Sequence, residues 1–311
     1  MPIVIKRCLW LCFSVAIVAA LPRAAYPGDE AGNDRAAGLL RLAIDEISRF
    51  NFDGAYASFV QAQRISVPGS DAWQEATFGA ATCTQQTLPP SEAKATEART
   101  LYQSLLEKSP ESKYAPRAMM NLGRLAELRD FFGDVVDLPG ARRWYQQVVD
   151  RWPNDSIAGE ATLRIAATYI QTYELEQVKL GVAVLESWLA KHPDDPLAGG
   201  MWNYLADTNF LPIENYPRAI ECYRQADRFR FADRNRQGGV YWRAAVIADR
   251  HLSDRDTAVY FYTKLITDVP NSGMGYAAQV ALKRLGAPAP DIQLSPPKRE
   301  PPAQPTAGAT P

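Results

Sequence analysis

The sequence predicts an all-α fold made of repeated helical hairpins, and a recurring residue pattern carries this prediction. In its clearest copy, a small residue, an aromatic residue, an apolar residue and a proline stand at relative positions 0, 4, 7 and 12, namely Ala141, Tyr145, Val148 and Pro153. The first three share one face of a helix, and the proline ends that helix. Five degenerate copies begin at residues 55, 98, 181, 219 and 258, so successive copies lie 43, 43, 40, 38 and 39 residues apart. Such a near-regular period is typical of helical solenoids.

A partner helix is expected upstream of every copy, because an apolar residue followed by a small one recurs there. These markers are Leu42-Ala43, Phe78-Gly79, Leu122-Gly123, Ile165-Ala166, Leu205-Ala206 and Ala244-Ala245. Small side chains at a contact let two helix axes approach closely. Two copies are looser than the rest, since Pro68 comes one residue late and Phe231 stands where a proline is expected. The sequence therefore predicts six helix pairs between residues 36 and 285.

The pairing of these markers carries a family resemblance. Leu122-Gly123 followed by Ala141, Tyr145 and Pro153 resembles the tetratricopeptide repeat, which has Leu-Gly in its first helix and Ala, an aromatic residue and Pro in its second. The resemblance implies a right-handed α-solenoid of about six helix pairs. The period is longer than the family's usual 34 residues. Together with links such as Pro110-Glu-Ser-Lys-Tyr-Ala, it is similar to the repeat proteins of the bacterial cell envelope, including outer-membrane assembly lipoproteins and cell-division coordinators.

The N-terminus has the features of an export signal. Lys6 and Arg7 precede an uncharged run from Cys8 to Ala20, and Leu-Pro-Arg-Ala-Ala follows. A run of 13 residues is shorter than the roughly 20 that span a bilayer as a helix. Residues 1–25 are therefore predicted to be a signal peptide, with 26–35 as a polar lead-in, although retention as an uncleaved anchor stays open. We expect a periplasmic or secreted protein without a membrane span after cleavage.

The C-terminal end is expected to hold one capping helix and a tail. In the stretch from Gly275 to Leu285, the spacing of Tyr276, Val280 and Leu285 predicts a helix that covers the last repeat with these three side chains. From residue 286 onward, 8 of 26 residues are proline. Residues 286–311 are therefore predicted to form a disordered or extended tail, and removing 288–311 is expected to leave stability unchanged.

Two insertions lengthen the repeats. Residues 87–97 begin with a Pro-Pro turn and continue with a helix-favouring run, which predicts an early start of the following helix. Residues 130–140 are unexpectedly apolar for a connection and contain Phe131 and Phe132. Two interpretations remain open for this second insertion: an extension of the preceding helix that packs on the solenoid, or a knob on which another protein docks.

Composition and motifs favour an interaction protein over an enzyme. The 34 basic and 35 acidic side chains nearly cancel, so no field attracts nucleic acid or an anionic membrane. The sequence contains no metalloprotease, phosphate-loop or nucleophile-elbow motif, and we expect no catalytic residue, cofactor or metal. Cys83 and Cys222 lie three repeats apart, beyond the reach of a disulfide in a solenoid, and are interpreted as buried apolar residues.

The resemblance also implies a concave groove lined by the first helix of each pair. Transferring the family's groove positions onto this sequence gives Trp73, Arg117, Met120, Arg124, Glu127, Asn203, Asp207, Trp242 and Asp249. Arg117 and Arg124 lie two helical turns apart, and neither has an acidic residue four positions away in the helix. We therefore expect both guanidiniums to be available to the carboxylates of an incoming peptide, so that reversing both charges abolishes binding with little effect on stability.

These expectations combine into one functional hypothesis. The protein is predicted to be a non-catalytic scaffold of the cell envelope that binds a peptide or helix of another protein, through either the groove or the 130–140 insertion. Two alternatives remain open. One is a regulatory or substrate-holding subunit of an envelope enzyme. The other is a glycan-binding or peptide-binding module that uses Trp73 and Trp242 as stacking platforms.

Overall fold

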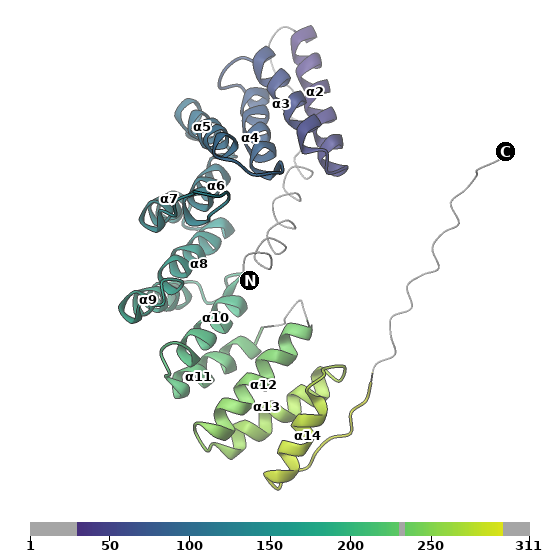
Figure 1. The fold of residues 1–311 in the computed structure, drawn as a ribbon, viewed down its shortest axis with the longest axis vertical. Helices are drawn as coiled ribbons and strands as arrows, with labels where there is room; N and C mark the ends of the chain where they lie inside the picture. Colours follow the sequence, from purple (N-terminus) through teal and green to yellow (C-terminus); the bar gives the residue numbers. More distant parts are fainter. Residues whose placement is uncertain (1–29, 230–233, 295–311) are drawn as a thin grey trace, which may run out of the picture. The chain divides into compact units, whose positions relative to one another are not determined.

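The computed structural model describes residues 30–229 and 234–294, and the predicted signal peptide lies outside them. Within these residues the chain forms thirteen α-helices and no strands (Figure 1). The helices are α2 (Glu30–Ser48), α3 (Phe52–Ile65), α4 (Asp71–Gln86), α5 (Glu92–Lys108), α6 (Ala115–Glu127), α7 (Leu138–Arg151), α8 (Ser156–Ile170), α9 (Leu175–Lys191), α10 (Ala198–Phe210), α11 (Tyr216–Asp227), α12 (Arg234–Arg250), α13 (Arg255–Asp268) and α14 (Gly275–Arg284). The six pairs run from α2/α3 to α12/α13, and the prediction of an all-α helical-repeat solenoid is confirmed.

The helices group into two compact units. The first ends at Thr172 and also includes Glu186–Trp188, and the second comprises Tyr173–Leu185 and the chain from Leu189 onward. In the first unit each helix packs on the next one along the chain, from α2 to α8. In the second unit the same holds from α10 to α14.

Polar side chains fix where the second helix of a pair begins. Asn51, Ser91 and Asp137 in the first unit, and Asn215 and Asp254 in the second, each accept a hydrogen bond from the backbone N–H three residues later. These bonds satisfy first-turn amides that have no partner within the helix. The early start of α5 after Ser91 agrees with the expectation for residues 87–97.

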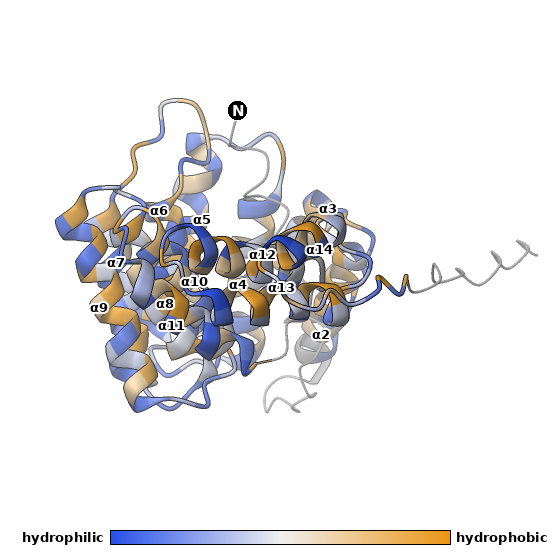
Figure 2. Cartoon of the chain, turned by 90° about the horizontal axis from the view of Figure 1, so that it is seen from below, coloured by the Kyte–Doolittle hydropathy of each residue, from blue (hydrophilic) through white to orange (hydrophobic). Residues whose placement is uncertain are grey.

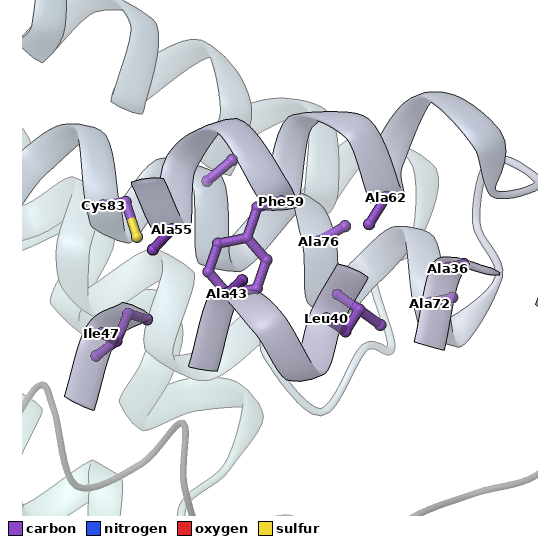
Figure 3. Close-up of a cluster of buried hydrophobic side chains, with 11 residues drawn as sticks. Ala36, Leu40, Ala43, Ile47, Ala55, Phe59, Ala62, Ala72, Ala76 and Cys83 are labelled. Carbon is purple, nitrogen blue, oxygen red and sulfur yellow. The ribbon is translucent and has the colours of Figure 1, made fainter. Parts of the chain in front are cut away.

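The pattern positions of the second helices form the core. In α3, α5, α7, α11 and α13, the small, aromatic and apolar residues of the pattern are at most 2% exposed. Figure 3 shows the first copy, in which the Phe59 ring lies among small and aliphatic side chains such as Ala43, Ala76 and Leu40. Hydrophobic and hydrophilic residues alternate along the helices in Figure 2. Each helix therefore buries one face against its neighbours, as the periodicity predicts.

Two glycines allow aromatic rings to approach the helix backbone. A Cβ at Gly123 would lie 2.4 Å from the Tyr145 ring of the same pair, closer than any real carbon contact. A Cβ at Gly79 would lie 2.4 Å from the Phe59 ring, which belongs to the preceding pair. The two Gly positions therefore serve different contacts, although their sequence markers look alike.

The capping helix α14 is present, but it buries a different face from the predicted one. Tyr276 and Val280 are 75% and 49% exposed, whereas Ala278 and Leu282 are buried. The expectation that Tyr276 and Val280 cover the last repeat is therefore wrong. The reason is register, because Pro270–Arg284 aligns without gaps to Pro110–Arg124, the segment that leads into and forms most of α6.

This alignment also shows one difference between α14 and α6. The helix α14 corresponds to the first helix of a seventh pair, and its residue at the position of Gly123 is Lys283. A Cβ at Gly123 would lie 2.4 Å from the ring of Tyr145, which belongs to the second helix of that pair. Lys283 is exposed, and its side chain occupies the position at which Gly123 admits the ring of the following helix.

The part of the tail that the structure describes lies against α14. The side-chain amide of Gln279 donates to the carbonyl of Pro290 at 2.7 Å, and Ile292 lies next to Gly275. Arg255 donates to the carbonyls of Leu285 and Gly286. Pro290 and Ile292 thus contact α14, so the expectation that residues 288–311 can be removed without consequence needs a direct test.

We expect two truncations to separate these parts of the tail. Removing 295–311 should leave the melting temperature unchanged, whereas removing 288–311 should also uncover α14 and cost about 1 kcal/mol, equivalent to about 2–4 °C for a domain of this size. Thermal unfolding followed by circular dichroism measures the difference. Equal melting temperatures for the two truncations would show that residues 288–294 contribute nothing.

Candidate functional site

Three residues of the predicted groove are buried. Trp73 and Glu127 are each 5% exposed, and Met120 is fully buried. Trp73 packs in the core cluster that also contains Tyr102 and Tyr114. A ligand can reach none of these three side chains without displacing the core, so their assignment as contact residues is corrected. The same burial removes Trp73 as a stacking platform for a glycan, whereas Trp242 is half-buried against the Tyr262 ring.

The two groove arginines are ion-paired. Arg117 donates to Glu160 of α8 at 2.7 Å, and Arg124 donates to both carboxylate oxygens of Asp130 at 3.2 and 3.4 Å. The expectation that both guanidiniums are available is therefore wrong. It considered acidic residues only within the same helix, whereas Glu160 comes from the next pair and Asp130 from a loop.

In the first unit, the buried carboxylate of Glu127 is hydrogen-bonded by a buried tyrosine. The Tyr145 hydroxyl donates to Glu127 at 2.7 Å, and Arg164 of α8 lies 3.9 Å from the other carboxylate oxygen. Burial and the charge of Glu127 raise the pKa of Tyr145 well above its usual value, so the phenol keeps its proton and remains a donor. This carboxylate therefore connects α6, α7 and α8.

The second unit repeats the arrangement of tyrosine, carboxylate and arginine. The Tyr223 hydroxyl donates to Asp207 at 2.5 Å, and Arg243 of α12 binds both carboxylate oxygens at 3.1 and 3.2 Å. Asp249 likewise accepts from Tyr262 and Arg284. Two further predicted groove residues thus join neighbouring pairs. One feature of the sequence indicates such hydrogen bonds. The aromatic position of the pattern is a tyrosine, which carries a hydroxyl, in four copies: Tyr102, Tyr145, Tyr223 and Tyr262.

Residues 128–137, which include most of the 130–140 insertion, form a loop between α6 and α7, and residues 138–140 begin α7. We name residues 128–137 the docking loop. The helix α6 ends at Glu127, so the interpretation of the insertion as an extended helix is wrong. The N–H of Asp137 donates to the carbonyl of Ala126 at 2.8 Å and closes the loop at its base, and the Asp137 side chain caps α7.

Internal bonds hold the docking loop in one conformation. The N–H of Asp130 donates to the Asp134 carboxylate at 2.9 Å, and the N–H of Asp134 donates to the carbonyl of Phe131 at 3.3 Å. Gly133 has a φ of +90°, a conformation that side chains disfavour, and so permits this turn. Arg124 anchors Asp130 from α6. The arginine predicted to bind a ligand therefore positions the loop instead.

The loop packs one aromatic side chain on the core and exposes the next to solvent. Phe131 is half-buried and packs against the core cluster formed by α4, α5 and α6. Phe132 is 104% exposed, Val135 is 80% exposed and Val136 is 37% exposed. An ordered loop that holds three apolar side chains in water is typical of an interaction site. Phe132, Val135 and Val136 are therefore accessible to another protein, and docking at this loop stays a prediction.

Metal ligands, membrane-spanning helices and cysteines were considered for the part of the chain that the structure describes. No group of three His, Cys, Asp or Glu side chains could hold a metal ion among residues 30–229 and 234–294. Over the same residues, no helix is long and apolar enough to cross a bilayer. Cys83 and Cys222 are both buried, as predicted.

Comparisons with known proteins identify the repeat type. The tetratricopeptide-repeat family model matches residues 240–272, which include most of α12 and all of α13. Among solved structures, the chain is similar to PilF of Pseudomonas aeruginosa, with a TM-score of 0.51, 15% identity, and coverage of 81% of this chain and 100% of that chain. No curated protein matches the sequence. The chain therefore contains a tetratricopeptide repeat at residues 240–272 within an all-α helical-repeat fold.

Proposed function

We propose that this protein is a non-catalytic scaffold that binds another protein through the docking loop. The observation that carries the proposal is the exposure of Phe132 and Val135 on a loop fixed by Arg124 and by its own hydrogen bonds. Because the loop is already ordered, little conformational entropy is lost when a partner covers it. Tetratricopeptide repeats commonly serve such protein interactions, which supports this class of function.

The helical repeats act as the rigid support of the loop. Polar groups along the first helices connect neighbouring pairs, as in the contacts Arg117–Glu160 and Arg164–Glu127. Such contacts stabilise the array and leave fewer groups for recognising a ligand. The docking loop is therefore the better supported of the two binding surfaces predicted from the sequence.

The cell envelope is the proposed location. The N-terminal sequence has a basic start and a short apolar run, which supports export through a signal peptide. The protein would then meet its partner in the periplasm or outside the cell. Regulation of an envelope enzyme through the same loop is included in this proposal, with the chemistry on the other chain.

Affinity capture from envelope extract tests the proposal. We expect Phe132→Ser combined with Val135→Ser to reduce recovery of a specific partner at least tenfold, because the loop loses its apolar contact while its hydrogen bonds remain. Tyr276→Ser is the matched control, since Tyr276 is 75% exposed on α14 and is not part of the loop. Quantitative mass spectrometry compares the three proteins. Equal recovery with wild type and loop variant would contradict the proposal.

The half-buried part of the predicted groove is the second candidate surface. Asn203, Asp207 and Trp242 of the second unit keep partial exposure. Trp242→Ala is the variant that separates the two surfaces, because this change leaves the docking loop intact. Loss of partner recovery with Trp242→Ala, but not with the loop variant, would assign binding to the groove.

A further inference from the structure

A hollow lies in the first unit beside two turns that lead from one helix pair to the next. We name it the turn hollow. Its walls are the first turn of α4 and residues 109–113, and its volume is about 390 Å³. This volume is at the lower end of the range of small-molecule sites, so it suits a small molecule and not a folded segment of a protein. The turn hollow shares no residue with the docking loop.

The turn hollow is a departure from the repeat. One pair later, Arg151 connects the corresponding turns, because it donates to the carbonyl of Pro110 and pairs with Glu111, each at 2.9 Å. The residue at the equivalent position beside the hollow is Lys108, since both residues precede the proline of the pattern by two positions. Lys108 instead lies over the Trp73 ring, 5.7 Å from its centroid. The space that Arg151 bridges between the later turns is therefore left open between the earlier ones.

A buried hydroxyl in the turn hollow has no partner. Ser109 lines the hollow and is 9% exposed, and its hydroxyl forms no hydrogen bond within residues 30–229 and 234–294. A hydroxyl can both donate and accept, and leaving it buried and unpaired costs free energy. Gly69 has a φ of +84°, and a Cβ added there would lie 3.7 Å from the Ser109 Oγ. Glycine therefore suits the backbone and also leaves the space next to this hydroxyl open to a ligand.

The wall that α4 forms supplies two further acceptors. The Asp71 carboxylate, in the first turn of this helix, forms no hydrogen bond or ion pair among the described residues. The side-chain nitrogen of Gln74 donates to the carbonyl of Gly69 at 2.8 Å. This bond orients the Gln74 amide and leaves its carbonyl oxygen to accept from a ligand. Both acceptors line the turn hollow together with Ser109.

The charges around the turn hollow nearly balance. Asp71 and Glu111 contribute two carboxylates, Lys113 contributes an ammonium group, and Arg151 pairs with Glu111. Such a balance attracts neither an anion nor a cation over long distances. The ligand must offer donors to Asp71 and acceptors to Lys113, and neighbouring hydroxyl groups do both. A zwitterion meets the same requirement only by losing the hydration of two charges, which costs more free energy than desolvating hydroxyls.

We propose that the turn hollow binds one unit of a neutral sugar. The hydroxyls of the sugar donate to Asp71 and Gln74 and accept from the ammonium group of Lys113. A further hydroxyl pairs with the buried Ser109, and C–H groups of the sugar ring contact the ring of Pro110. This site adds a small-molecule ligand to the proposed scaffold, and it does not depend on the docking loop.

Titrations followed by backbone-amide NMR test this site in the full-length protein. The probes are glucose and N-acetylglucosamine, with alanine as a zwitterion and inorganic phosphate as an anion. We expect at least one sugar to give saturable shifts that are confined to residues 69–74 and 109–113. The dissociation constant should be about 1 mM, because a six-carbon sugar has only about 12 non-hydrogen atoms with which to make contacts. Shifts with alanine or phosphate alone, sugar shifts elsewhere in the chain, or no saturable shift far above this concentration would each overturn the proposal.

Two conservative variants locate the site within the hollow. Asp71→Asn removes the charged acceptor and Ser109→Ala removes the buried hydroxyl, so each should weaken sugar binding by about fivefold, as the loss of one hydrogen bond does. Asp150→Asn is the matched control, because Asp150 is an exposed carboxylate of α7 that does not line the hollow, and its affinity should be unchanged. Circular dichroism verifies that all three variants are folded. Equal affinity in the three variants would overturn the site, whereas partner recovery through the docking loop should be unaffected in each of them.

Discussion

Replacing Tyr145 by alanine should lower the free energy of unfolding by about 3–5 kcal/mol, as other truncations of buried aromatic residues do. Tyr145 is fully buried, and its ring fills the space left by Gly123. The change also removes the hydroxyl that donates to the buried Glu127. A buried carboxylate that loses a donor adds its own desolvation cost.

Chemical denaturation of two variants separates these contributions. Tyr145→Phe keeps the ring and deletes the hydrogen bond, so it should cost about 1–3 kcal/mol. Tyr276→Ala serves as the control, because Tyr276 is largely exposed, and it should change stability by less than about 0.5 kcal/mol. If Tyr145→Ala were no more destabilising than Tyr276→Ala, the repeat core described above would be incorrect.

The second large effect is expected at Gly123. Gly123→Ala places a Cβ 2.4 Å from the Tyr145 ring, which is fully buried and held by its hydrogen bond to Glu127. Overpacking of this kind costs about 1–3 kcal/mol, despite the better helix propensity of alanine.

Gly239→Ala provides a control of opposite sign. Gly239 lies inside α12, and the nearest atom to its added Cβ is a terminal nitrogen of Arg243 at 3.7 Å. The substitution should therefore stabilise the protein by about 0.5–1 kcal/mol through helix propensity. Thermal and urea unfolding compare the two variants. Stabilisation by Gly123→Ala would show that α6 and α7 lie further apart than described.

The residue pattern alone predicted most of the repeat architecture. Its small, aromatic and apolar positions lie at helical spacing, and burying one face per helix leaves few alternatives to stacked pairs. The prolines mark where the second helices end for the same local reason, since proline cannot continue the hydrogen-bond pattern of a helix. These signals are encoded in neighbouring residues, so they can be read without knowledge of distant contacts.

The candidate site could not be derived in this way. The sequence indicated that Phe131 and Phe132 were unusual for a connection, but their fates differ, because Phe131 packs on the core and Phe132 faces solvent. The assignment of Arg117 and Arg124 failed because their partners lie in another pair and in a loop. Ion pairs between segments depend on how helices stack, which spacing within one helix does not reveal.

Sequence by itself thus determined the helix pairs, their period and the burial of their aromatic positions, because helix formation and one-sided burial follow from local spacing. Only the tertiary structure decided which polar groups are engaged between pairs and which apolar side chains remain in water. The register of α14 shows the physical reason. Ala278 and Leu282 were as well spaced for burial as Tyr276 and Val280, and the choice between these faces depended on the surface of α13 on which they pack.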